Sequence, residues 1–234
     1  MSTYKGRGIH GQVVEIIGRR LVTGEFPENG RIDLVELEAE LQVSRTVVRE
    51  ALKVLASKGL VDSRQKRGTV VRPRGEWNLL DPDVISWEFE NRGSQMLSQL
   101  AEVRQMFEPA AAALAAVRRG EADLAELEGA LQDMSAARTP AEAASADLRF
   151  HRAVLAATGN ELLVRMEVVV ESVLAERDRI VHDVVTADDP VPSHRALLDA
   201  IRAGDEQAAR SCALALLDKA MADVDRAALI RGDR

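Results

Sequence analysis

The sequence predicts a mostly α-helical protein, in which an N-terminal winged helix-turn-helix precedes a C-terminal all-α helical bundle. Apolar residues recur at three- and four-residue spacing over most of the 234 residues, which is the pattern of amphipathic helices. The only strand-like runs, "LVDSR" and "GTVVRP", flank the polar "QKRG" and so predict one hairpin. The length favours two domains, and aromatic residues make up only 3% of an alanine-rich chain, which favours closely packed helices.

The N-terminal elements follow from local signals. A first helix is predicted over residues 8–23 and ends at "GEFPENG", where proline and glycine interrupt the pattern. Asp33 is placed to cap a second, short helix with leucines on its inner side. After the turn "QVS", a third helix runs from Arg45 to Ser57, and Gly59 stops it at the C′ position. Two helices joined by a tight turn and followed by a hairpin make a winged helix-turn-helix.

The second half of the chain reads as helices alone. We place a DNA-binding domain at residues 1–73, a linker at 74–82 ("PRGEWNLLDPD" with its prolines and glycine) and a helical effector-binding and dimerisation domain at 83–234. Glycine and proline positions divide that domain into about seven helices. These helices are expected at 83–92, 95–119, 121–136, 140–158, 160–185, 192–203 and 205–230.

Charge is distributed unequally between the halves. Residues 1–75 hold 14 Lys and Arg against nine Asp and Glu, a net charge of +5, whereas residues 76–234 hold 17 against 29, a net charge of −12. This asymmetry favours a basic module that meets a polyanion. A lone Cys212, no secretory signal and no long apolar run predict a soluble cytoplasmic protein that does not contact a membrane.

The start of the third helix has the composition of a DNA reader. In a helix-turn-helix the second helix of the motif enters the major groove, where arginine bonds guanine and hydroxyl groups bond phosphates. A glycine and two cations at the hairpin tip suit an approach to the minor groove. A solvated basic helix without a partner is the alternative that the hairpin and the charge balance disfavour. The predicted DNA contacts are Ser44, Arg45, Thr46, Arg49, Lys66, Arg67 and Gly68.

The helical half holds a second constellation. Asp147 and His151 are four residues apart and so share a helix face, and His194 opens a later helix. One carboxylate and two imidazoles suit a divalent metal, with zinc favoured over nickel, manganese or iron. On spacing alone, a simple surface pair of Asp147 and His151 is the stronger alternative.

The N-terminal motifs carry a family resemblance. "VSRTVVREALKVLASKGLVDSRQKRGTVV" resembles the winged helix of GntR-type bacterial transcription regulators over about residues 8–73. The resemblance implies that Arg45 and Arg49 read bases and that Gly68 lies at the wing tip. The chain departs from the family at "RIDLVEL", where Val35 stands in place of a DNA-contacting arginine, so that contact is absent or comes from Arg31.

Residues 79–230 resemble the FCD effector domain of the FadR-type subfamily, through "D-x-x-x-H … TGN" and "H-x-x-L-x-x-A-I-x-x-G-D". The resemblance implies that Asp147, His151 and His194 hold a metal inside the bundle and that a carboxylate effector completes its coordination. Leu216 stands where the family often has a third histidine, so the metal would keep open positions or be held weakly. Arg104 matches an arginine that faces the pocket; a surface arginine beside Glu108 is its alternative.

The connector "EWNLLDPDVISWEFEN" resembles that of galactonate-responsive repressors in the subfamily, as do "EVR…EPA" and "H-x-A-L-x-D-A-I-R". The leading hypothesis is therefore a homodimeric DNA-binding repressor of sugar-acid catabolic genes, not an enzyme. It would bind a near-palindromic double-stranded operator and release it on binding an aldonate. The alternatives are a metal-dependent enzyme acting on a small carboxylate and a DNA-binding protein without an effector.

Overall fold

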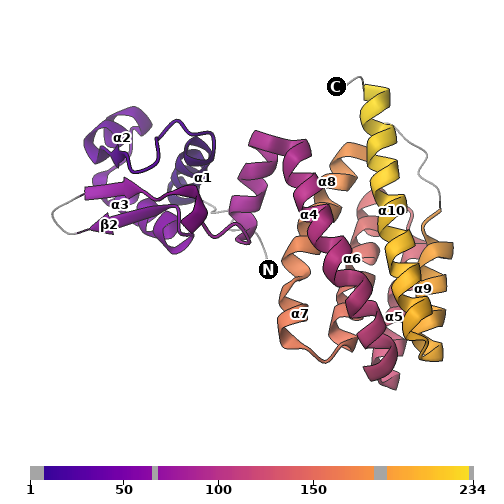
Figure 1. Cartoon of the computed structure of the whole chain (residues 1–234). Coiled ribbons are helices and arrows are strands. Elements are labelled where there is room, and N and C mark those ends of the chain that lie inside the picture. Colours follow the sequence, from indigo (N-terminus) through magenta and orange to yellow (C-terminus); the bar gives the residue numbers. More distant parts are fainter. Residues whose placement is uncertain (1–7, 65–67, 182–188, 232–234) are drawn as a thin grey trace. The chain divides into compact units, whose positions relative to one another are not determined.

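A computed structural model describes residues 8–64, 68–181 and 189–231. It divides the chain into two compact units, Met1–Ser94 and Gln95–Arg234, and shows a helical protein with one small sheet in the N-terminal unit (Figure 1). The predicted fold class is confirmed. No helix among the described residues combines the length and the apolar character that a membrane span needs.

The N-terminal unit is a winged helix-turn-helix. Its sheet is antiparallel with strand order β1-β3-β2, and β2 and β3 form the predicted hairpin. Strand β1 is an addition to the prediction, because two residues are too short for an alternating pattern to be recognised. The elements are α1 (Ile9–Val22), β1 (Arg31–Ile32), α2 (Leu34–Leu41), α3 (Arg45–Ser57), β2 (Val61–Arg64) and β3 (Gly68–Val71).

Local capping sets the ends of the two helices of the motif. The side chain of Asp33 accepts a hydrogen bond from the backbone N–H of Val35 at 2.8 Å, as the sequence predicts for an N-cap. Helix α2 ends where Gln42 takes a left-handed conformation, with φ 53°. Helix α3 ends before Gly59, whose φ of +78° favours glycine at the C′ position.

Residues 74–94 belong to the N-terminal unit, although the sequence predicts a linker at 74–82. They form a 3₁₀ turn (Arg74–Glu76) and the beginning of α4 (Pro82–Arg118). Trp87 is buried in the core of the winged helix, and the ammonium of Lys58 contacts Asp81 at 2.8 Å and Asp83 at 2.6 Å. The boundary therefore falls after Ser94, because an apolar opening turn of α4 completes the N-terminal core.

The C-terminal unit is a helical bundle whose elements correspond closely to the predicted ranges. Arg92 has non-helical angles (φ −132°, ψ 26°), which separates two predicted helices within α4. The helix predicted over 160–185 is instead two helices, and no glycine or proline marks the break. The remaining elements are α5 (Glu121–Ala136), α6 (Pro140–Ala157), α7 (Glu161–Arg165), α8 (Glu167–Val181), α9 (Val191–Ala203) and α10 (Glu206–Arg231).

Small side chains let these helices approach closely. Ala112, Ala115 and Ala116 on α4 are fully buried and pack in one cluster with Phe150 of α6 and Leu198 of α9. Thr139 begins α6 with a capping box, in which its hydroxyl accepts from the N–H of Glu142. The cluster fixes α4, α6 and α9 against one another, and these helices carry the polar residues described next.

Candidate functional site

The predicted DNA-reading residues lie together on one exposed face of α3. Ser44, the N-cap residue, is exposed, as are Arg45, Thr46 and Arg49. The opposite face of the helix is buried in the core of the unit, with Val48 among its residues. The helix therefore presents its polar N-terminal part to solvent, which is the geometry that groove insertion needs.

Arg45 has an acidic neighbour in this structure. Its Nε lies 3.6 Å from Oε1 of Glu38 on α2, and its side chain is 65% exposed. An exposed ion pair of this kind contributes little energy, so Arg45 can exchange Glu38 for another acceptor at small cost. Val35, which stands where related proteins often have arginine, is 64% exposed on α2, and Arg31 is exposed beside it on β1.

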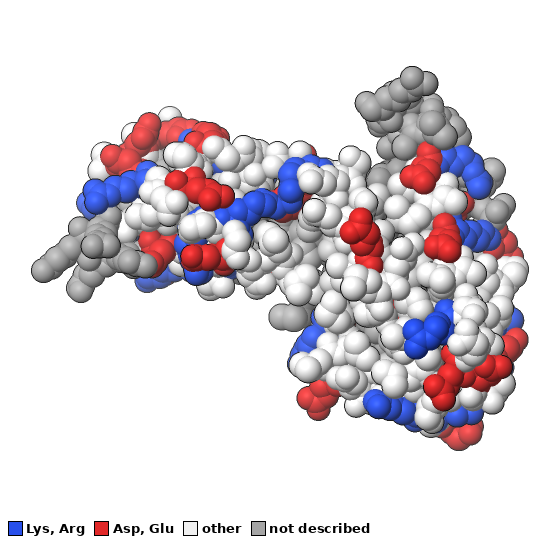
Figure 2. Space-filling model, viewed as in Figure 1, with Lys and Arg blue, Asp and Glu red and all other residues white. Residues whose placement is uncertain are grey.

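The wing is described in part. Lys66 and Arg67 lie outside the described residues. Gly68 begins β3 with φ +78°, is exposed, and has open space where a Cβ would stand. On the face of this unit that Figure 2 shows, basic side chains lie among acidic ones, so the net positive charge of residues 1–75 is not one continuous patch there.

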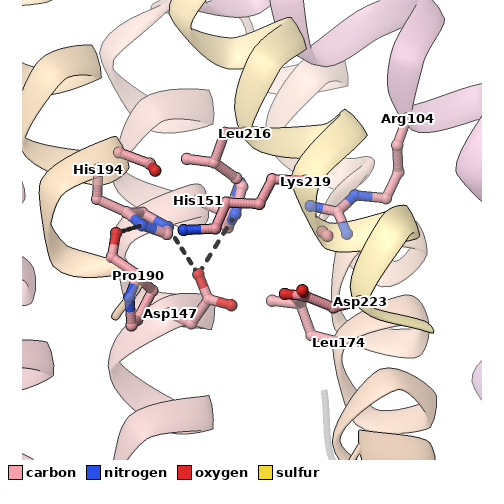
Figure 3. Close-up of a pocket in the computed structure, with 11 residues that line it drawn as sticks. Arg104, Asp147, His151, Leu174, Pro190, His194, Leu216, Lys219 and Asp223 are labelled. Carbon is pink, nitrogen blue, oxygen red and sulfur yellow. Dashed lines mark hydrogen bonds and ion pairs between the residues drawn. The ribbon is translucent and has the colours of Figure 1, made fainter. Parts of the chain in front are cut away.

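The second constellation forms a pocket inside the bundle. Asp147 and His151 of α6 and His194 of α9 line it together with residues of α4 and α10 (Figure 3). One ligand-type atom from each of these three residues lies within 4.8 Å of the other two. Both histidines are buried, so the alternative of a surface pair does not describe the site.

The hydrogen bonds of His194 define its orientation. Its Nδ1 lies 2.8 Å from the carbonyl oxygen of Pro190, and its Nε2 lies 2.9 Å from Oδ1 of Asp147. A carbonyl oxygen only accepts, so we assign the hydrogen to Nδ1. The ring of Phe150 packs edge-on against the imidazole, with centroids 4.9 Å apart. Nε2 is thereby directed at the Asp147 carboxylate.

His151 is oriented in the same way by a different partner. Its Nδ1 lies 2.9 Å from Oε2 of Glu108 on α4, and its Nε2 lies 3.5 Å from Oδ1 of Asp147. Burial by itself raises the pKa of Glu108, but the charges of Arg104 and His151 outweigh it and lower that pKa to about 2. Glu108 is thus an ionised acceptor that holds the hydrogen on Nδ1.

Two imidazole Nε2 atoms and one carboxylate oxygen therefore converge. If both imidazoles are neutral, three electron-rich atoms face one another and require a cation between them. Ligand atoms about 2.0–2.2 Å from zinc lie about 3–3.5 Å apart at tetrahedral angles, and the two contacts to Asp147 Oδ1 measure 2.9 and 3.5 Å. The donor set and its spacing fit a divalent metal ion.

Protonation is the other way to satisfy this cluster. Burial by itself lowers the pKa of His151, but the charge of Glu108 and the hydrogen bonds to Asp147 and Glu108 outweigh burial and raise that pKa to about 9. Burial likewise opposes ionisation of Asp147, yet hydrogen bonds from His151 and His194 hold the pKa of its carboxyl well below the usual range. The site therefore carries an ionised carboxylate whose neighbours must supply positive charge.

Two further predicted positions line the same pocket. Arg104 of α4 is buried, with its side chain only 3% exposed, and its Nε and Nη2 both contact Glu108. The alternative of a surface arginine is therefore wrong in its burial, although the pairing with Glu108 is present. Leu216 of α10 is buried at the pocket wall, and its apolar side chain cannot ligate a metal.

Fold and site together define a two-part regulator, with a DNA-binding winged helix and a sensory helical domain. A model of the bacterial regulatory proteins of the gntR family matches residues 9–71, and a model of the FCD domain matches residues 99–219. The chain belongs to the gntR family and carries an FCD domain.

Relatives over nearly the whole length agree with this assignment. The chain is 35% identical to the galactonate operon transcriptional repressor of Escherichia coli, over 88% of this chain and 92% of the relative. It is 34% identical to the regulator LutR of Bacillus subtilis, over 83% and 91%. The solved structure of Lar, which controls the Listeria monocytogenes agr system, shares the fold with a TM-score of 0.64 at 19% identity, over 95% of this chain and 99% of that one.

The family answers the question of class. These relatives are transcription regulators and not enzymes, so the chain is a DNA-binding transcriptional regulator. The metal-dependent enzyme considered from the donor set alone does not describe this protein.

Proposed function

We propose that the protein is a ligand-responsive repressor of sugar-acid catabolic genes, whose FCD pocket binds an aldonate such as galactonate and thereby releases the operator. The convergence of His151 and His194 on Asp147 inside a buried pocket carries the proposal. The similarity to a galactonate operon repressor over most of both chains supports the class of effector.

Asp147, His151 and His194 would hold a divalent metal, with zinc first and nickel, manganese or iron as alternatives. Bound there, the metal supplies a positive centre with open positions for the carboxylate and an adjacent hydroxyl of the effector. Glu108 and the carbonyl of Pro190 hold the two imidazoles in the required orientation. Arg104 lines the same pocket and would contribute hydrogen bonds to the acid.

On the DNA side, the exposed face of α3 would enter the major groove. Arg45 and Arg49 would read bases, while Ser44 and Thr46 would bind phosphates. Lys66, Arg67 and Gly68 of the wing would reach the adjacent groove. Two such modules in a homodimer would bind the half-sites of a near-palindromic operator.

Effector control requires that the acid distinguish two states of the protein. A ligand that binds both states equally shifts nothing, whatever its affinity. The effector would therefore bind the form with low operator affinity more tightly than the DNA-binding form. Arg104 and Glu108 on α4 link the pocket to the helix whose first turns pack in the winged-helix unit.

The test begins with calorimetric titration of galactonate and related aldonates into the protein, as purified and after chelation followed by dialysis. We expect binding that disappears with the metal and returns when zinc is added. An operator selected from random double-stranded DNA then allows the same acids to be tested for release of DNA. Operator affinity unchanged by any of these acids would instead support an effector-independent DNA-binding protein.

A substitution separates the pocket from the DNA-binding face. His151→Ala should remove both the metal and the response to the acid, while binding to the selected operator remains. Arg149→Ala is the matched control on α6, because Arg149 is exposed and pairs with Glu126 outside the pocket. An unchanged effector response in His151→Ala would show that the acid binds elsewhere.

A further inference from the structure

Helix α10 contributes an unassigned cation to the pocket. Lys219 is half-buried and lines the same pocket as Asp147 and His194. Figure 3 shows its side chain extending from α10 into the pocket, toward the side where Asp147 and His194 lie. Its Nζ lies 3.5 Å from the backbone carbonyl oxygen of Asp189, at the long limit for a hydrogen bond.

The residues that α10 presents to the pocket follow helical spacing. Leu216, Lys219 and Asp223 are three and four residues apart, so they share one face of the helix. This face supplies an apolar wall, an ammonium group and a carboxylate. Asp223 is buried, and its Oδ1 lies 3.8 Å from Arg226.

The pocket needs positive charge to accept an acid. The carboxylates of Asp147 and Asp223 both line it, and an anionic ligand placed among them is repelled unless cations compensate. Arg104 meets this need only in part, because its Nε and Nη2 already contact the ionised Glu108. A buried guanidinium that shares its charge with a carboxylate offers less of that charge to a ligand.

Lys219 differs from Arg104 in the kind of contact it makes. The contact to Asp189 is with a neutral carbonyl at long range, and a ligand carboxylate forms a stronger, charge-assisted bond with an ammonium. A lysine also has a flexible four-carbon stem and three donors that can follow a ligand. Movement of Nζ toward a bound acid therefore costs little.

We infer that Lys219 binds the carboxylate of the effector and determines that the pocket takes a sugar acid in preference to the corresponding neutral polyol. The inference rests on the proposed function, because it names the residue that selects the ligand at the same site. Lys219 acts beside the metal and is separate from its ligands.

The experiment compares galactonate with galactitol, which has a hydroxymethyl group in place of the carboxylate. Both are titrated by calorimetry into zinc-supplemented wild type, Lys219→Met, Lys219→Arg and the control Arg210→Met, an exposed position on α10 with the same change of charge. Zinc affinity is measured in parallel by competition with a chelator, and circular dichroism checks folding.

We expect Lys219→Met to bind galactonate at least about tenfold more weakly, as the loss of one charge-assisted hydrogen bond predicts. Binding of galactitol and of zinc should be no weaker than in wild type, Lys219→Arg should keep most of the galactonate affinity, and Arg210→Met should match wild type. Galactonate binding by Lys219→Met equal to that of wild type would overturn the inference and leave the proposed function standing. Absence of aldonate binding by wild type would overturn both.

Discussion

Nδ1 of His151 on α6 lies 2.9 Å from Oε2 of Glu108 on α4, so a buried carboxylate from one helix sets the orientation of an imidazole on another. The same carboxylate contacts the guanidinium of Arg104. Glu108 therefore connects the two halves of the pocket, the donor cluster and the buried arginine.

Replacement of Glu108 by glutamine should weaken metal binding. Loss of a carboxylate that orients a metal-binding histidine typically costs about 10–100-fold in metal affinity, and we expect a decrease in that range for zinc in a chelator competition. Glu126→Gln is the matched control, because Glu126 is an exposed partner of Arg149. Zinc affinity equal to wild type in Glu108→Gln would show that Glu108 does not act through His151.

Arg45→Ala should lose sequence-specific operator binding without loss of stability. Each bidentate arginine–guanine contact provides about 1–3 kcal/mol of discrimination, and a dimer loses the contact in both half-sites. Because the side chain is 65% exposed, the free energy of unfolding should change by no more than about 0.5 kcal/mol. Gel-shift titration and urea unfolding measure the two effects.

Lys53→Ala is the control for that substitution, since Lys53 lies further along α3, is equally exposed and pairs with Glu50. It should retain discrimination between operator and random DNA. Specific binding that survives in Arg45→Ala would refute the assigned groove contact.

Metal affinity should rise with pH between about pH 6 and pH 8. In the metal-free protein the pKa of His151 is raised to about 9, so this imidazole keeps its second proton throughout that range. The metal must displace that proton, and displacement of one proton increases the apparent affinity about tenfold per pH unit. Zinc competition titrations at pH 6, 7 and 8 test this, and a constant affinity would contradict the assignment of His151 as a ligand.

Gly18→Ala should destabilise the winged-helix unit. A Cβ at Gly18 would lie 2.4 Å from ring atoms of Trp87, which is 1% exposed, and overpacking of a core typically costs about 1–3 kcal/mol. The gain in helix propensity of about 1 kcal/mol is smaller. We expect a net loss of about 1–2 kcal/mol in urea unfolding.

Gly75→Ala serves as the comparison, because a Cβ there meets no atom within 4 Å. A Gly18→Ala protein more stable than wild type would mean that Trp87 does not pack on α1, and would return residues 82–94 to the role of a linker.

Several features of the protein could be read from local sequence. Asp33 and Gly59 mark helix ends because capping depends on a few adjacent residues. The spacing of Asp147 and His151 places them on one helix face for the same reason. The exposed face of α3, with Arg45 at its start, also followed from helical periodicity, since the apolar residues of that helix had to face the core.

The tertiary structure decided what local spacing cannot. His194 is 47 residues from Asp147 and meets it only because α9 packs on α6. Glu108 was recognisable as a neighbour of Arg104, but its contact with His151 depends on the packing of α4. Lys219 carried no signal at all, since a lysine on an amphipathic helix ordinarily faces solvent.

The division of the chain shows the same limit. Prolines and glycine around residues 74–82 indicate a connector by composition, yet Trp87 belongs to the N-terminal core. Local sequence determines where a helix begins, ends and turns its apolar side, because those properties depend on residues within a few turns. Which helix buries that side, and which polar groups meet there, depends on contacts between residues far apart in the chain, and only the packed structure specifies them.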